Sequence, residues 1–127
     1  MKEKPTYNLG DLVDKLSILS MKIYFGDESS IAEHRYLEKG LEAWGINGKI
    51  VTNAIRLALM NRLVWEQEHE ARKCMKSEAE MTQKELIEQG KINIRVRDYN
   101  RKRVEYKNVI NEVSKGFKES KVQHRSS

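Results

Sequence analysis

Residues 92–117 read INIRVRDYNRKRVEYKNVINEVSKGF. Large side chains recur in this stretch at spacings of four and three residues, at Ile92, Val96, Tyr99, Tyr106, Ile110, Val113 and Phe117. This spacing predicts one apolar stripe along an α-helix. Arg103 stands where the spacing asks for an apolar residue, so we expect its guanidinium to point at whatever the helix packs against. A buried charge is costly unless it is paired or bound, which makes Arg103 the most informative position in the stretch.

The first part of this stretch also fits a β-strand. Residues 91–97 alternate between polar and apolar side chains, as a half-buried strand does. The helical stripe covers the same Ile92 and Val96 and extends much further, and a lone strand would have no partner elsewhere in the chain. The helix is therefore the favoured interpretation of residues 91–97.

Three further helices and a short one are predicted from periodicity and from capping residues. The helices span about residues 9–25, 31–44 and 49–75, with a short helix that ends at Gln89 because Gly90 is expected to break it. Ser30 with Glu33, and Thr82 with Glu85, have the spacing of capping boxes. In the first helix the leucines share one face, from which we expect the charged side chains Asp11, Asp14, Lys15 and Lys22 to turn away.

These elements predict an all-α fold, an antiparallel helical bundle of four to five helices. The chain has 127 residues and 39% hydrophobic content, which is enough for one core. We therefore expect a single domain over residues 1–127, with residues 1–7 and 118–127 mobile. The long helix over residues 49–75 is apolar on two sides, with Ile55, Leu59 and Leu63 opposite the main face. A helix of that kind is central to its bundle or buried between subunits, so we expect a homo-oligomer.

Composition bears on the compartment and on partners. The apolar runs are too short to cross a bilayer, the first residues lack the apolar core of a signal peptide, and Cys74 is the only cysteine. We expect a cytoplasmic protein with no membrane partner and no cofactor. The net charge is +5, and residues 91–127 hold eleven Lys or Arg against four acids. Such a basic segment can attract nucleic acid, nucleotides or an acidic partner.

Three short motifs resemble those of a known family. The first helix reads Gly10-Asp11-Leu12-Val13-Asp14-Lys15-Leu16-Ser17-Ile18 and is similar to the pattern Gly-Glu-Leu-Ile-Asp-Lys-Leu-Ser-Ile. The patterns Leu-Trp-His-x-Glu-Asp-x-Ala-Arg and Asn-x-x-Arg are met by Val64, Trp65, Glu68, Ala71 and Arg72, and by Asn100 and Arg103. Glu66 and His69 replace the His and the Asp of the second pattern. The chain thus resembles an uncharacterised family of small, all-helical microbial proteins, classed as a domain of unknown function. The resemblance implies a helical fold and names no activity.

A polar pocket inside the bundle is one candidate site. Polar residues lie in line with the core stripes of the two long helices, at Asn61, Glu68, Arg72, Asn100 and Arg103. Arginine presents a planar fork that suits carboxylate or phosphate, so these residues could bind a small anion or a nucleotide. The competing interpretation is a structural network in which Glu68 neutralises an arginine, including an ion pair between Glu68 and Arg72.

Two kinds of metal site are alternatives. Glu66 and His69 have the spacing of a di-iron half-site, but no second Glu-x-x-His copy exists, so we expect both side chains to be solvated and predict no metal site. A metal-dependent, all-α nucleotide pyrophosphohydrolase would need three or four convergent carboxylates to hold magnesium. The carboxylates that it could recruit are Asp11, Asp14, Glu66 and Glu70.

A last alternative is nucleic-acid binding through the basic third of the chain. Arg95, Arg97, Arg101 and Lys102 surround Tyr99, and basic residues interleaved with an aromatic can hold phosphates and stack a base. Because Tyr99 belongs to the core stripe, the charges alone would have to bind. We therefore favour a binding or protein-interaction module over an enzyme, built on a homo-oligomeric bundle.

Overall fold

The computed structural model describes residues 7–74 and 76–115. Four α-helices and no strand occur within these residues, which confirms the all-α prediction. The helices are α1 Leu9–Tyr24, α2 Ile31–Lys39, α3 Gly48–Arg72 and α4 Gln83–Ser114, joined through 3₁₀ turns at Glu28–Ser30, Gly40–Ala43 and Glu78–Glu80. Phe117, the expected mobile tail and most of the expected mobile lead-in lie outside the described residues.

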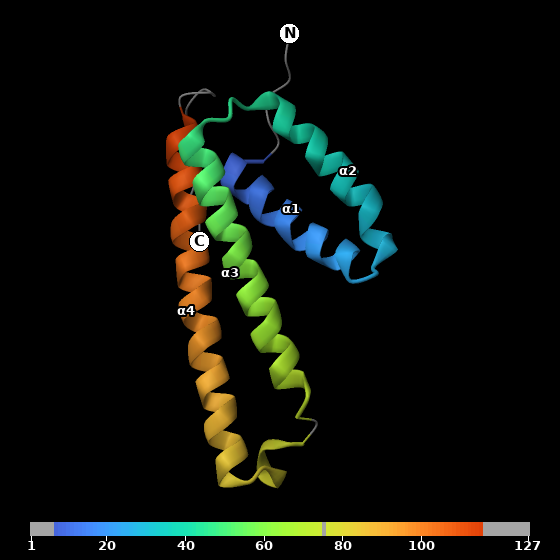
Figure 1. Ribbon diagram of the computed structural model, residues 1–127, viewed down its shortest axis with the longest axis vertical. Helices are drawn as coiled ribbons and strands as arrows, with labels where there is room; N and C mark the ends of the chain where they lie inside the picture. Colours follow the sequence, from blue (N-terminus) through green and yellow to red (C-terminus); the bar gives the residue numbers. More distant parts are fainter. Residues whose placement is uncertain (1–6, 75, 116–127) are drawn as a thin grey trace.

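The helices form two antiparallel hairpins of unequal length (Figure 1). The long hairpin consists of α3 and α4, which contact each other along their lengths. The short hairpin consists of α1 and α2, and α1 packs against both α3 and α4. It covers only the half of the long hairpin that contains the start of α3 and the end of α4 (Figure 1). The other half, which leads to the loop between α3 and α4, projects beyond it and has no third layer.

The main core lies in the covered half. Its buried members come from α1, α2, α3, α4 and the turn before α3, and they are Leu9, Leu12, Leu19, Leu37, Trp44, Ile50, Leu57 and Ile110. In the projecting half, Ile92 of α4 is buried. The predicted stripe of α4 is confirmed at Ile92 and Ile110, which are buried, and at Tyr106 and Val113, which pack partly buried against the core.

Helix α1 is packed on two opposite sides. Leu12 lies against the turn that follows α2, because a Cβ placed on Gly40 would come within 3.3 Å of its Cδ2 atom. On the opposite face, the backbone N–H of Gly10 donates to Oδ1 of Asn111 on α4, at 2.7 Å. Side-chain capping of the free N–H groups at a helix start usually comes from within the same segment. Here Asn111, which is far along the chain, accepts the hydrogen bond from Gly10 and so holds the start of α1 against α4.

Of the two predicted capping boxes, one is present and the other is not. The capping box of α4 is confirmed, because the Glu85 backbone N–H donates to Oγ1 of Thr82 and the Thr82 N–H donates to Glu85 Oε1. The capping box expected at Ser30 and Glu33 is wrong. The Ser30 hydroxyl donates to Oδ2 of Asp27 at 3.1 Å and makes no cap bond, because the nearby carboxylate is the stronger acceptor.

Two predicted helix ends are also wrong. Gly90 does not break a helix: α4 runs through it without interruption. A glycine inside a helix costs roughly 1 kcal/mol relative to alanine, and packing of α4 on α3 on both sides of Gly90 offsets that cost. The α-helix expected over residues 31–44 ends at Lys39, after which the chain tightens into the 3₁₀ turn Gly40–Ala43.

Alanine substitutions at Gly10 and Gly90 should change stability in opposite directions. A Cβ on Gly10 would lie 2.5 Å from the Lys107 carbonyl oxygen and 2.7 Å from Asn111 Oδ1, so Gly10→Ala should destabilise by about 1 to 3 kcal/mol. Nothing lies within 4 Å of a Cβ on Gly90, so Gly90→Ala should stabilise by about 0.5 to 1 kcal/mol. Urea unfolding followed by circular dichroism measures both. A wild-type midpoint for Gly10→Ala would contradict the close approach of α1 to α4.

Candidate functional site

Four polar side chains meet where α1, α3 and α4 pack together. We call Asp14, Ser17, Asn61 and Arg103 the polar core cluster. The Asn61 amide Nδ2 donates to Asp14 Oδ1 at 2.8 Å and to Ser17 Oγ at 2.6 Å. The Ser17 hydroxyl in turn donates to the backbone carbonyl of Asp14 at 2.9 Å. Asp14 is 9% exposed and Asn61 4%, so this network is formed away from bulk water.

Arg103 supplies the positive charge of the cluster. Its Nε lies 3.8 Å from Asp14 Oδ1, and its side chain is 28% exposed. That separation is within ion-pair range but longer than a hydrogen bond, and the buried Nε has no hydrogen-bond partner among the described residues. Arg103 therefore neutralises the Asp14 carboxylate by charge, while Asn61 makes the hydrogen bond to it. The prediction that Arg103 points at a packed neighbour is confirmed.

Asp14 is buried, which contradicts the prediction that its side chain turns away from the packed face of α1. Asp14 is buried because α1 lies between α2 and the long hairpin and so has two packed sides. Gly10, Asp14 and Ser17 follow one another at spacings of four and three, which places them on one face. That face, small and polar in sequence, meets α3 and α4. The spacing was the signal that could have revealed it.

The predicted pocket residues are only partly brought together. Asn61 and Arg103 share the cluster, and Asn100 is half-buried one turn of α4 away from Arg103. Glu68 and Arg72 are both exposed. No ion pair joins Glu68 to Arg72 in the described part of the chain, which contradicts that expectation. Both residues follow Asn61 along α3 in the projecting half, where α1 and α2 no longer cover the hairpin (Figure 1).

The carboxylates that a metal-dependent hydrolase would need are held apart by different cations. Glu66 pairs with Arg62 at 2.9 Å, and Glu70 pairs with Lys73 at 2.9 Å. Asp11 pairs with Lys107 at 3.3 Å, and Asp14 belongs to the polar core cluster. Within residues 7–74 and 76–115, no group of three or more His, Cys, Asp or Glu side chains is arranged to hold a metal ion. Glu66 and His69 are exposed, as expected.

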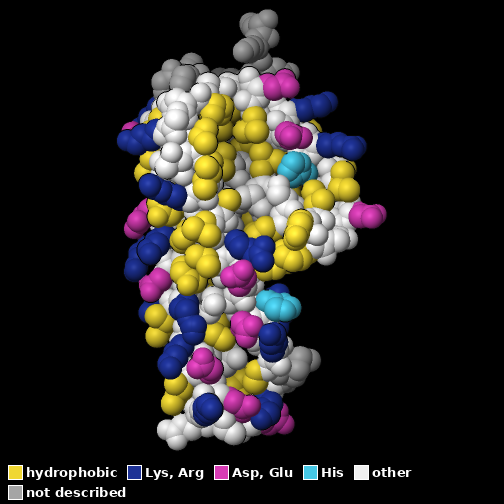
Figure 2. Space-filling view, viewed as in Figure 1, with side chains coloured by type: hydrophobic (Ala, Val, Ile, Leu, Met, Phe, Trp, Pro, Cys, Tyr) yellow, Lys and Arg dark blue, Asp and Glu magenta, His cyan; other side chains and the backbone are white. Residues whose placement is uncertain are grey.

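The basic residues proposed for nucleic acid are dispersed. Arg95 donates to Gln67 Oε1 at 3.3 Å, and Arg101 pairs with Asp98 at 3.1 Å. Arg97 and Lys102 are exposed. Lys and Arg side chains alternate with acidic ones along the surface of the long hairpin (Figure 2), so the visible face shows no continuous basic patch.

The second apolar side that was predicted at Ile55, Leu59 and Leu63 is confirmed on α3 at Ile55 and Leu59, whereas Leu63 is half-buried and Val51 is exposed beside them. Val51, Ile55 and Leu59 follow at intervals of four and are 46%, 65% and 52% exposed. We call these three residues the α3 stripe. Figure 2 shows hydrophobic side chains along the covered half of α3. Of the helices described, none is long and apolar enough to cross a membrane.

Comparison with known proteins adds no functional assignment. No protein-family model matches the chain, and neither a curated protein nor a solved structure does. The polar core cluster and the surfaces around it are the features of the molecule that bear on function. The cluster contains no pairing of a nucleophile with a base, since the Ser17 hydroxyl proton is directed at a backbone carbonyl. Its chemistry is that of a network that positions helices.

Removing the Asp14 carboxylate should destabilise the fold. Asp14→Ala leaves the Asn61 amide with one hydrogen bond fewer and the partly buried Arg103 without its counter-charge, which should cost about 2 to 3 kcal/mol. Glu112→Ala is the matched control, because Glu112 is an exposed acid paired with Lys115 and should change stability by less than about 0.5 kcal/mol. Urea unfolding would refute the role of Asp14 if both variants had the same midpoint.

Proposed function

We propose that this protein is a protein-interaction module that self-associates through the outer face of α3, in the cytoplasm. The α3 stripe is the observation that supports it. Isolated exposed aliphatic side chains are ordinary, whereas a contiguous exposed apolar patch marks an interaction surface. Val51, Ile55 and Leu59 occupy successive turns of one helix, in the half of the molecule whose backbone is held by α1 and α2. The single cysteine suits a reducing compartment.

The residues that flank the stripe favour close approach of a second helix. Gly48, Thr52 and Ala58 lie on the same face by spacing, and nothing lies within 4 Å of a Cβ placed on Gly48. Small side chains let two helix backbones approach, so that large side chains from each can pack between them. The face thus combines three large aliphatic residues with small ones beside them.

A second copy of the chain fits this face better than a different partner because the face is complementary to itself. Its large residues are placed symmetrically about Ile55, so an antiparallel pair of α3 helices related by a two-fold axis at Ile55 opposes Val51 with Leu59 of the other copy. The same arrangement opposes Arg62, the next residue on this face, with the small Gly48. A parallel pair would instead oppose Arg62 with its own copy, and like charges repel.

The anion pocket is a weaker proposal on this geometry. The arginine that would bind the anion already has the Asp14 carboxylate beside it, and a second negative charge would be repelled by that group. The dispersed carboxylates and dispersed basic residues likewise give little support to the hydrolase and nucleic-acid alternatives. The exposed face of α3 is apolar and symmetric, and the core packs behind it, so it favours self-association.

A charge placed in the α3 stripe should convert the assembly to monomers. Ile55→Asp introduces a carboxylate at the proposed two-fold axis, where it would face its own copy, while the side chain stays in solvent in the monomer. Sedimentation equilibrium should show an oligomer for the wild type and a monomer with unchanged helicity for Ile55→Asp. Ile94→Asp is the matched control, because Ile94 of α4 is 52% exposed and outside the stripe. A monomeric wild type, or equal disruption by both variants, would refute the proposal.

The antiparallel arrangement predicts which engineered cysteines cross-link. In a Cys74→Ser background, Val51→Cys mixed with Leu59→Cys should form a disulfide-linked dimer under mild oxidation, because the two positions face each other across the axis. Val51→Cys alone should not, because its own copy lies about 12 Å away along the helix, at 1.5 Å per residue. Gel electrophoresis without reductant measures the outcome. Efficient cross-linking of Val51→Cys to itself would instead indicate a parallel pair.

A further inference from the structure

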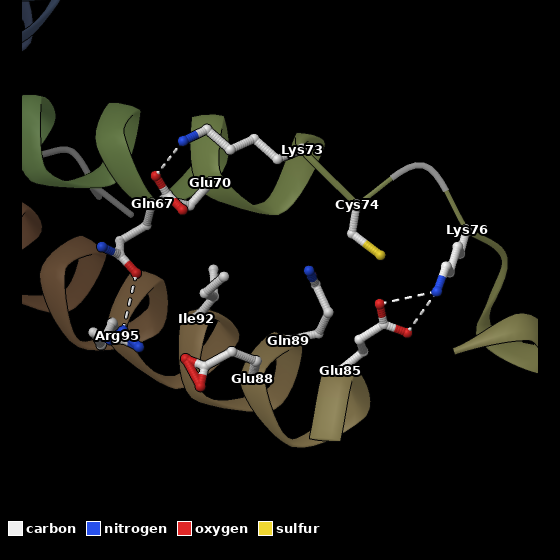
Figure 3. A pocket seen from close by; sticks show the side chains of 10 residues that line it. All are labelled: Gln67, Glu70, Lys73, Cys74, Lys76, Glu85, Glu88, Gln89, Ile92 and Arg95. Carbon is white, nitrogen blue, oxygen red and sulfur yellow. Dashed lines mark hydrogen bonds and ion pairs between the residues drawn. The ribbon is translucent and has the colours of Figure 1, made fainter. Parts of the chain in front are cut away.

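A cleft lies at the far end of the projecting half, between the last turns of α3 and the first turns of α4. Its volume is about 560 Å³, which is within the range of small-molecule sites, about 300 to 1,000 Å³. Figure 3 shows Ile92 of α4 pointing into its middle, with Gln67 and Arg95 on one side and Gln89 on the other. It is remote from both the polar core cluster and the α3 stripe.

Two ion pairs at the rim neutralise most of the charge around the cleft. Glu70 pairs with Lys73 on the α3 side, and Lys76 bonds both carboxylate oxygens of Glu85 at 3.1 and 3.0 Å on the other. The hydrogen bond from Lys73 lowers the pKa of Glu70. The pKa of Glu85 is lowered by the Thr82 backbone N–H and then by Lys76. Both carboxylates are therefore ionised at neutral pH, and each is matched by a lysine.

Two charged side chains of opposite sign, Glu88 and Arg95, line the cleft without an ion pair to any described residue. The Glu88 carboxylate has no hydrogen-bond or ion-pair partner in the described part of the chain, and Arg95 has only the neutral Gln67 oxygen. Glu88, Ile92 and Arg95 are spaced by four and then three residues, so they share one face of α4. The cleft lining thus contains an exposed carboxylate, an apolar side chain and a guanidinium on one face of α4.

We propose that this cleft binds a short linear zwitterion with the chemistry of a di- or tripeptide that has free ends. The guanidinium of Arg95, held by Gln67, receives the terminal carboxylate in the forked geometry that suits it. Glu88 receives the terminal ammonium, and Ile92, which points into the cleft, contacts an apolar part of the ligand. The Gln89 amide points toward the centre of the cleft and makes no bond to the described residues (Figure 3), so it is free to bond a peptide group. This activity is separate from self-association.

The order of charges distinguishes such a ligand from simpler ones. A bare anion would meet Arg95 but also the unpaired Glu88, and a bare cation would meet the reverse. A molecule that bears both a positive and a negative group can satisfy both residues at once.

Trialanine is the probe for this proposal, measured by titration of the full chain followed by amide resonances in NMR. Saturable shifts should appear for residues at the end of α3 and the start of α4. N-acetyl-trialanine and trialanine amide, which each lack one charge, should bind about tenfold more weakly or worse, because each leaves one charged group unmatched. Absence of saturation with trialanine, or equal affinity for the three peptides, would overturn the proposal.

Variants separate this site from general surface charge. Arg95→Ala and Glu88→Gln should each weaken trialanine binding about tenfold or more, and Glu88→Gln preserves size and helix propensity. Arg97→Ala is the control, because Arg97 is an exposed arginine two residues away and does not line the cleft. Ile55→Asp should bind trialanine as the wild type does. Loss of binding in Arg97→Ala to the same extent as in Arg95→Ala would show nonspecific attraction and refute the assignment.

Discussion

The arrangement of the four helices depends on the Asn61 amide, which holds the Asp14 carboxylate where α1, α3 and α4 meet. A carboxylate in this position is stable only with a hydrogen-bond donor and a counter-charge. Helix α3 supplies the donor, Asn61, and helix α4 supplies the counter-charge, Arg103. Rotating α1 by one residue would move Asp14 by 100° and carry it away from Asn61 and Arg103. The polar contact therefore specifies the rotation of α1, and the bond from Gly10 to Asn111 fixes its position along the hairpin. Because α2 packs mainly on α1, its placement follows from the same two contacts.

The length of α1 explains why the molecule has two unlike halves. Helix α1 has 16 residues and α4 has 32, which correspond to about 24 and 48 Å of helix. A short hairpin fixed at the end of α4 can cover only half of the long one. The covered half acquires a third layer and most of the core. The projecting half is left as two helices around Ile92, with a cleft between their ends.

The sequence predicts the long helices well and the contacts between them less well. The α4 stripe and the Thr82 cap depend on local spacing, and both are found in the structure. Arg103 and Asn61 are recognisable because a polar residue interrupts an apolar stripe. Glu68 continues the same pattern on α3 but is exposed, because sequence spacing does not reveal where α1 ends. Asp14 is missed for a related reason: hydrophobic periodicity reports the leucine face of α1, and a second buried face made of glycine, aspartate and serine gives no such signal.

The two proposed surfaces can operate independently because of this division. The α3 stripe ends at Leu59 and the cleft begins at Gln67, which lies about 12 Å further along the same helix. The stripe is backed by the core, so α3 is rigid where self-association would need a fixed face. The cleft is in the half with few buried side chains, where local opening requires less free energy than opening of the core. A ligand that contacts both Glu88 and Arg95 would bind to that less stable half, and it would stabilise the α3–α4 end without changing the contacts that place α1.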